Sequence, residues 1–167
     1  TDAAIDAAMP VLLGALEDPN NYYAKMAVIS LGELGLKAGD AVPSVRQALK
    51  SVDPDTRTYA AIALADIGDT EFATNALAEL IQDKELHGRH LVLKKLSSLG
   101  SQANSAIPVL INLLLDDADK RYGDRALAAV ALNDIDPNNS AVVSALRTAW
   151  RDKKLSVHLQ KRGLLPE

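Results

Sequence analysis

Two histidines near the middle of the chain are the first residues whose type and spacing could support chemistry. His87 and His90 are three residues apart, with Glu85 close by, at the start of an expected helix. Histidines at i and i+3 can share a metal ion on one helical face, but a zinc site usually needs three or four protein ligands. The remaining histidine, His158, is far along the chain. We therefore expect a solvated, polar helix start, with no metal or cofactor.

Other sequence patterns typical of catalysis are also missing. Gly32, Gly35 and Gly39 are spaced as helix ends, and no Gly-Lys-Ser/Thr follows them as in a phosphate-binding loop. No Gly-x-Ser-x-Gly nucleophile elbow occurs. The chain has no cysteine, which excludes disulfides, thiolate metal sites and a thiol nucleophile. We therefore expect a protein that is not an enzyme.

Composition and charge limit the classes of partner. The chain has 167 residues with a formal net charge of -4, whereas proteins that bind nucleic acid through phosphates usually present a basic surface. No apolar run approaches the roughly 20 residues of a membrane span. We expect a protein or peptide partner, no nucleic acid and no membrane. The chain starts at Thr1 without Met, and no signal peptide is visible, so we expect either a trimmed chain or an excised domain of a longer protein, and the compartment stays open.

A repeat of 31 to 35 residues is the main signal in the sequence. One position recurs once in each repeat, and its occurrences form the column given below. An apolar residue stands one position before each member of this column, and others stand two, three and six positions after it. Arg46 is the exception. This spacing predicts one apolar stripe of an α-helix. The members of the column, at intervals of 33, 31, 34 and 35 residues, are Pro10, Pro43, Thr74, Pro108 and Val143.

A second helix follows in each repeat. Counting back from Gly35, Gly68, Gly100 and Asp136, small or apolar residues stand eight, seven, four and one positions earlier. Neighbouring helical hairpins must bury these stripes against each other, because no single hairpin has its own core. The sequence therefore predicts one all-α repeat domain over residues 1–167, made of about five helical hairpins. The predicted repeats are approximately 6–39, 40–70, 71–104, 105–139 and 140–167.

Residues that begin and end helices agree with these repeats. We expect Asp40, Ser105 and Ser140 to be N-caps of first helices, and the column prolines to lie in first turns. Gly35, Gly68 and Gly100 are expected to end second helices. The turns between paired helices are expected at Asp18-Pro19 and Asp53-Pro54. Neither end of the chain has the polar cap that such an array requires, so we expect a longer array or ends that pack on something else.

The stretch Asp53 to Gly68, DPDTRTYAAIALADIG, resembles the second-helix signature of the HEAT-repeat family in its short bacterial form, related to phycobilisome-lyase repeats. Lys84 to Gly100 and Asp124 to Asp136 match more loosely. The resemblance implies a right-handed α-α superhelix, a HEAT-like solenoid. It also implies a ladder of turn aspartates and second-helix arginines. The implied pairs are Asp53 with Arg57, Asp83 with Arg89 and Asp117 with Arg125, while Ala24 takes the arginine position of the first repeat.

Second helices line the concave surface of a HEAT-like solenoid, and their exposed positions can be read as rows. The first row is Lys25, Thr58, His90 and Ala126, and the second is Ile29, Ile62, Lys94 and Val130. Apolar residues on a solvated face either form a contact strip or are half-buried by neighbouring repeats, and both readings stay open. The candidate partner-binding residues are Tyr22, Lys25, Ile29, Tyr59, Ile62, His90, Lys94 and Val130.

Three functions fit these patterns. The favoured one is a non-enzymatic scaffold that holds a protein partner along the concave face or at the ends of the array. The phycobilisome-lyase resemblance implies a bilin lyase or chaperone as an alternative, although no aromatic and basic pocket for a tetrapyrrole is evident. A regulatory segment of a larger enzyme is the other alternative, and the uncapped ends favour it.

Overall fold

The structure is a computed structural model that describes residues 2–18 and 21–164. All regular structure in this part of the chain is helical, as predicted, and none of the described helices is long and apolar enough to cross a membrane. The chain divides into two compact units, Thr1–Leu77 and Ala78–Glu167. Each unit is described by itself below.

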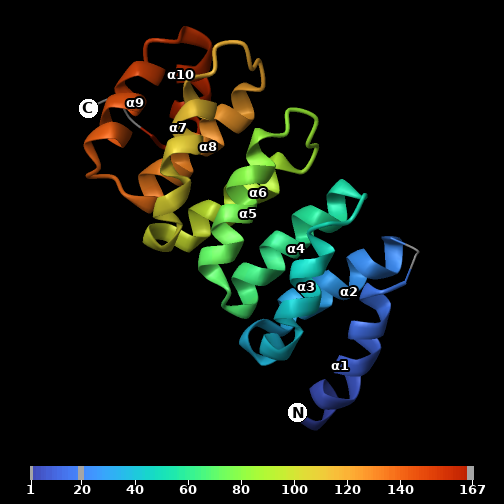
Figure 1. The fold of residues 1–167 in the computed structure, drawn as a ribbon. Coiled ribbons are helices and arrows are strands. Elements are labelled where there is room, and N and C mark those ends of the chain that lie inside the picture. The colour runs from blue at the N-terminus through green and yellow to red at the C-terminus, as the bar shows by residue number, and fades with distance from the viewer. Residues whose placement is uncertain (1, 19–20, 165–167) are drawn as a thin grey trace. The chain divides into compact units, whose positions relative to one another are not determined.

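The first unit contains two layers of helices (Figure 1). The second helices α2 and α4 pack side by side in one layer, and the first helices α1 and α3 pack on them and on each other. A 3₁₀ segment, η1, connects the two hairpins. The bounds are α1 Asp2–Leu16, α2 Asn21–Leu34, η1 Gly35–Ala41, α3 Val42–Ala48 and α4 Pro54–Ile67.

The second unit follows the same plan. The second helices α6, α8 and α10 lie in sequence, because α8 packs against both α6 and α10, while α7 packs against α9. Helix α5 runs across the division between the units. The bounds are α5 Thr70–Gln82, α6 Arg89–Leu99, η2 Gly100–Ala106, α7 Ile107–Leu115, α8 Tyr122–Ile135, α9 Ser140–Ala149 and α10 Lys153–Gln160.

The predicted apolar stripes form the cores of both units. Val28 and Leu31 of α2 and Leu64 of α4 are fully buried, and the small residues between them let helices approach closely. Arg46, the polar residue in the first-helix stripe, reaches the surface instead. It donates to both carboxylate oxygens of Asp69, at 2.7 and 2.9 Å, and its guanidinium lies over the ring of Phe72.

Gly32 marks the closest approach of α2 and α4. A Cβ added there would lie 3.1 Å from Ala63 Cβ and 3.2 Å from Ala63 Cα, whereas a Cβ at Gly14 of α1 would meet nothing within 4 Å. We expect Gly14→Ala to stabilise the protein by up to about 1 kcal/mol through helix propensity. Gly32→Ala is expected to be less stable than the parent, because the added methyl forces α2 and α4 apart. Urea unfolding compares the two, and equal stabilisation would exclude tight packing at Gly32.

The predicted helix ends at glycine are confirmed. Gly35, Gly68 and Gly100 have φ angles of 59°, 105° and 53°, a region that side chains other than glycine rarely adopt. Asp53 caps α4, since its carboxylate accepts from the backbone N–H of Thr56 at 2.9 Å, with Pro54 in the first turn. Asp53-Pro54 is therefore a turn as predicted, while Pro19 of the other predicted turn lies outside the described residues.

Three predicted N-caps are wrong. Asp40 and Ser105 lie inside η1 and η2, so α3 and α7 follow a 3₁₀ turn and begin without a side-chain cap. Ser140 is the first residue of α9, and the side chain of Asn139 accepts from the N–H groups of the next turn. Pro43 and Pro108 lie in first turns, as predicted. Pro10 lies inside α1, which contradicts the prediction.

Candidate functional site

A hollow of about 420 Å³ lies between α2 and α4 in the first unit. Ile29, Tyr59 and Ile62 line it with half-buried side chains. Gly32 and Ala63 also line it, where the two helices meet most closely. Two exposed carboxylates, Glu33 and Asp66, stand at one end, four residues after Ile29 and Ile62. We call this hollow the α2–α4 groove. It brings three of the eight candidate residues together.

The other five candidates lie elsewhere. Tyr22 is exposed on α2, where its ring meets Tyr23 edge to face, and Lys25 pairs with Asp55 at 3.2 Å. His90 and Lys94 are exposed on α6, and Val130 is half-buried on α8. These last three belong to the second unit.

The first predicted row is not an exposed row. Thr58 and Ala126 are buried, and the hydroxyl of Thr58 donates to the carbonyl of Pro54. Lys25 is half-buried and His90 is exposed. The row therefore mixes core and surface positions.

His87 and His90 are both exposed. Within residues 2–18 and 21–164, no group of three or more His, Cys, Asp or Glu side chains could hold a metal ion.

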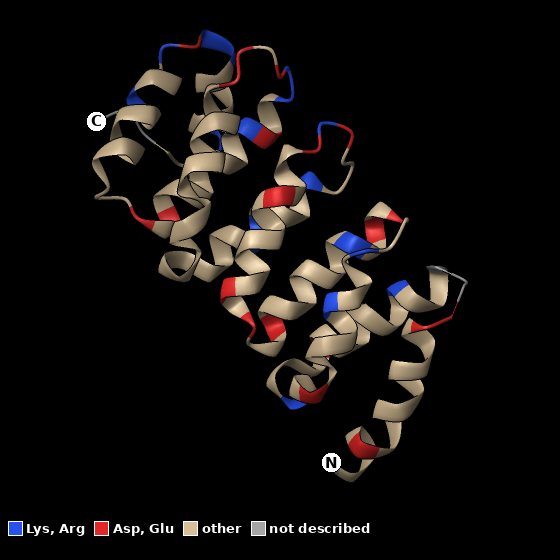
Figure 2. Cartoon of the chain, viewed as in Figure 1, with Lys and Arg blue, Asp and Glu red and all other residues tan. Residues whose placement is uncertain are grey.

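Charged side chains gather at the turns that join paired helices, and they differ from the implied ladder (Figure 2). Arg57 does not pair with Asp53. Its Nη1 donates to the carbonyls of Ser51 and Val52, at 2.8 and 3.1 Å. The Asp53 carboxylate accepts from the N–H and hydroxyl of Thr56 instead. This implied pair is wrong because the carboxylate is used as a helix cap.

Arg89 corrects the second implied pair. Its Nη2 donates to the backbone carbonyl of Asp83, at 2.7 Å, rather than to the Asp83 carboxylate. Its Nη1 donates to Asp119 in the turn of the following repeat, at 2.8 Å, and both side chains are buried. The Asp83 carboxylate accepts from the N–H of Glu85.

Arg125 confirms the third implied pair and adds to it. Its Nη2 lies 3.4 Å from Asp117 Oδ1, its Nε donates to the carbonyl of Leu114 at 2.9 Å, and its Nη1 reaches Asp152 Oδ2 at 3.3 Å. Asp152 is the N-cap of α10, in the next repeat.

The cations therefore connect successive repeats. Lys25 with Asp55 and Lys84 with Asp116 follow the same pattern as Arg89 with Asp119. Each pair joins the second-helix start or turn of one repeat to the turn of the next. The sequence contained a signal for these inter-repeat pairs. Each cation and its carboxylate are 27 to 32 residues apart, which is close to the length of one repeat.

These contacts also set the ionisation of the turn carboxylates. Hydrogen bonds from the side chain of Arg121 hold the pKa of Asp119 far below its usual range, and Arg89 adds to the effect. The pKa of Asp53 is lowered mainly by the hydroxyl of Thr56, and that of Asp152 by the N–H of Leu155. These aspartates are charged at neutral pH.

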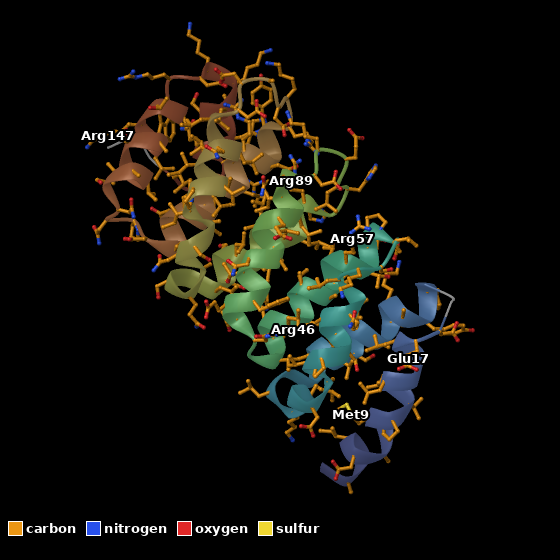
Figure 3. All side chains as sticks on the ribbon, in the orientation of Figure 1. Met9, Glu17, Arg46, Arg57, Arg89 and Arg147 are labelled. Atoms are coloured by element: carbon orange, nitrogen blue, oxygen red, sulfur yellow. The ribbon has the colours of Figure 1, made fainter. Side chains whose placement is uncertain are left out.

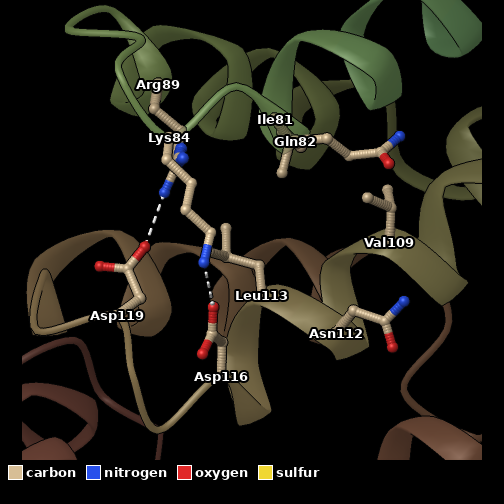
Figure 4. Close-up of a pocket in the computed structure, with 9 residues that line it drawn as sticks. All are labelled: Ile81, Gln82, Lys84, Arg89, Val109, Asn112, Leu113, Asp116 and Asp119. Carbon is tan, nitrogen blue, oxygen red and sulfur yellow. Dashed lines mark hydrogen bonds and ion pairs between the residues drawn. The ribbon is translucent and has the colours of Figure 1, made fainter.

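A second hollow, of about 200 Å³, lies beside this ladder in the second unit (Figure 4). Ile81, Val109 and Leu113 form its apolar part. The Arg89–Asp119 pair and the Lys84–Asp116 pair lie on its other side (Figure 4). Each cation of these two pairs faces a carboxylate of the next repeat, and Arg89 Nε is buried without a hydrogen-bond partner, so this hollow lies at a junction between repeats.

Comparison with known proteins agrees with the helical repeat. The model of the family described as HEAT repeats matches residues 9–87. The match names HEAT repeats in general and does not extend to the phycobilisome-lyase type. No curated protein matches the chain. The match supports the HEAT-repeat family, and the paired, layered helices of the described residues have the all-α fold of a HEAT solenoid.

Proposed function

We propose that this protein is a non-enzymatic scaffold for protein–protein interaction, and that the α2–α4 groove is one of its docking points. HEAT repeats commonly mediate such interactions. The observation that carries the proposal is the gathering of Ile29, Tyr59 and Ile62 around one hollow. Half-exposed aliphatic and tyrosine side chains around a concavity are typical of the places where a partner's side chain anchors.

The charges around the groove favour a partner segment with a basic side chain. Glu33 and Asp66 stand at one end of the apolar lining, and both are exposed. A basic side chain next to an apolar anchor would complement these carboxylates. The proposed partner segment therefore presents a large apolar residue beside Lys or Arg.

A displayed peptide library tests this proposal. Panned on the parent protein, the library should yield peptides with an apolar residue flanked by Lys or Arg. Ile29→Glu/Ile62→Glu is expected to weaken these peptides at least about tenfold, since it places charge in the apolar part of the groove. Val130→Glu is the comparison variant, because it places one glutamate at a half-buried candidate position of α8 that does not line the α2–α4 groove.

The comparison requires that all variants keep the parent's helicity and melting temperature. Peptides that bind the double variant as well as the parent, or that lose binding equally in Val130→Glu, would exclude the α2–α4 groove as the docking point.

A further inference from the structure

Two hollows in the chain occupy equivalent places in the repeat. One is the hollow of Figure 4, and the other lies between α1 and α3 in the first unit. Their first-helix lining stands at the same offsets, one, four, five and eight residues after Pro43 or Pro108. The matching sets are Ser44, Gln47, Ala48 and Ser51 in the first unit and Val109, Asn112, Leu113 and Asp116 in the second.

The residue at the second-helix wall differs between the two hollows. Arg89 and Ala24 both stand 11 residues before the glycine that ends their helix, in the same column as Arg57 and Arg125. Arg89 lines its hollow, which measures about 200 Å³, whereas the hollow beside Ala24 measures about 380 Å³. We call the larger one the Ala24 hollow. It has a methyl group at the position where the smaller hollow has an arginine side chain.

The arginines of this column all donate hydrogen bonds to backbone carbonyls. Arg57 and Arg89 each donate to a turn carbonyl six residues earlier, and Arg125 donates to the carbonyl of Leu114. Arg89 and Arg125 also reach a carboxylate of the next repeat. Ala24 supplies none of these donors. Lys25, its neighbour, is directed to Asp55 and does not line the Ala24 hollow.

The acceptors that a guanidinium needs surround the Ala24 hollow. Glu17, the residue after α1, is exposed and is one of its lining residues; its position is labelled in Figure 3. Ser51 and Thr56 line it as well, and both are bonded to Asp53. Asp53 is the N-cap of α4, in the same role that Asp152 has at α10, and Asp152 accepts from Arg125. The Ala24 hollow thus has one carboxylate, that of Glu17, and two further lining residues that bond to the N-cap of α4.

We propose that the Ala24 hollow binds an arginine side chain of a partner protein, which takes the vacant place in the ladder. The proposal goes beyond the docking function of the α2–α4 groove and does not depend on it. Arginine is specified because its planar guanidinium can donate to a carbonyl and a carboxylate at once, as Arg89 does. A lysine ammonium on a flexible stem, or a neutral isostere, lacks this combination.

The test is an NMR titration of the parent protein with a capped Gly-Gly-Arg-Gly-Gly peptide. The expected result is a saturable shift of the amide signals of Ala24, Ser51 and Thr56, with a dissociation constant in the millimolar range typical of one anchored side chain. The same peptides with lysine or citrulline in place of arginine are expected to bind about tenfold more weakly. Equal shifts from the lysine peptide, or no saturable shift at these amides, would overturn the proposal.

Two variants that fill the hollow from within provide the control. Ala24→Arg restores the column and is expected to abolish the peptide shifts without lowering the melting temperature. Ala24→Met fills the same space without charge and should also block the peptide, so the test survives if one variant does not fold. Undiminished binding to a folded Ala24→Met variant would place the peptide elsewhere on the surface and overturn the proposal.

Discussion

Asp119→Ala is expected to lower the free energy of unfolding by about 3–5 kcal/mol, because it leaves the guanidinium of Arg89 buried without its carboxylate. The side chains of Arg89 and Asp119 are only 2% and 5% exposed, and Nη1 and Oδ2 are 2.8 Å apart. Removal of one member of a buried pair costs far more than the pair itself contributes, since the remaining charge loses water and partner together. Urea unfolding measures the change.

Asp116→Ala is the matched control for this prediction. Asp116 lies three residues earlier in the chain and pairs with Lys84 at 3.5 Å, but the Lys84 side chain is 69% exposed. An ion pair this open to water is expected to contribute less than about 1 kcal/mol. A similar loss of stability in the two variants would contradict the role assigned to burial. The double variant Arg89→Met/Asp119→Leu is expected to recover most of the loss, because no charge then stays buried.

Periodicity and glycines were enough to predict the helical hairpins. Leu31, Leu64 and Leu132 are fully buried because stripes at helical spacing must face another helix in a protein of this composition. Gly35 and Gly68 adopt positive φ where the predicted second helices end. These signals are local, so a single sequence contains them in full.

Helix starts were harder to predict, because two competing local structures share the same residues. Asp40 has the side chain of an N-cap, but η1 continues through it to Ala41, so the chain stays helical with 3₁₀ hydrogen bonds. At α9 the neighbouring Asn139 accepts the capping hydrogen bonds in place of Ser140. A polar residue near a helix start indicates the boundary only to within a residue or two.

The ladder was predicted with the right arginines and mostly the wrong acceptors. Arg89 was assigned to Asp83, the turn aspartate of its own repeat, but the bonded carboxylate belongs to Asp119 in the next repeat. Local spacing cannot distinguish a carboxylate within the repeat from one a full repeat away, because both meet at the same turn once hairpins stack. The α2–α4 groove could not be predicted for the same reason, because sequence spacing does not show where two helices meet in space. Ile29 and Ile62 were predicted as one row, while their joint hollow depends on the close approach of α2 to α4 at Gly32.

Arg125→Met is expected to cost about 3 kcal/mol, because one buried guanidinium serves three acceptors in two repeats. It is 2% exposed, and its loss leaves the carbonyl of Leu114 buried without a donor and the Asp152 carboxylate without its cation. Arg151→Met, at an exposed position one residue before Asp152, should change stability by no more than about 0.5 kcal/mol.

The location of faster hydrogen exchange in Arg125→Met distinguishes two roles for Arg125, a link between repeats and ordinary core packing. If Arg125 holds α10 through Asp152, hydrogen exchange should accelerate at the amides of Leu155 and Ser156 in Arg125→Met more than in α7, because the first turn of α10 loses the guanidinium that anchors its cap. A uniform acceleration of hydrogen exchange through the unit would show that Arg125 stabilises the unit only by core packing. Acceleration confined to α10 would show that Arg125 connects its own repeat to the next one through the N-cap Asp152.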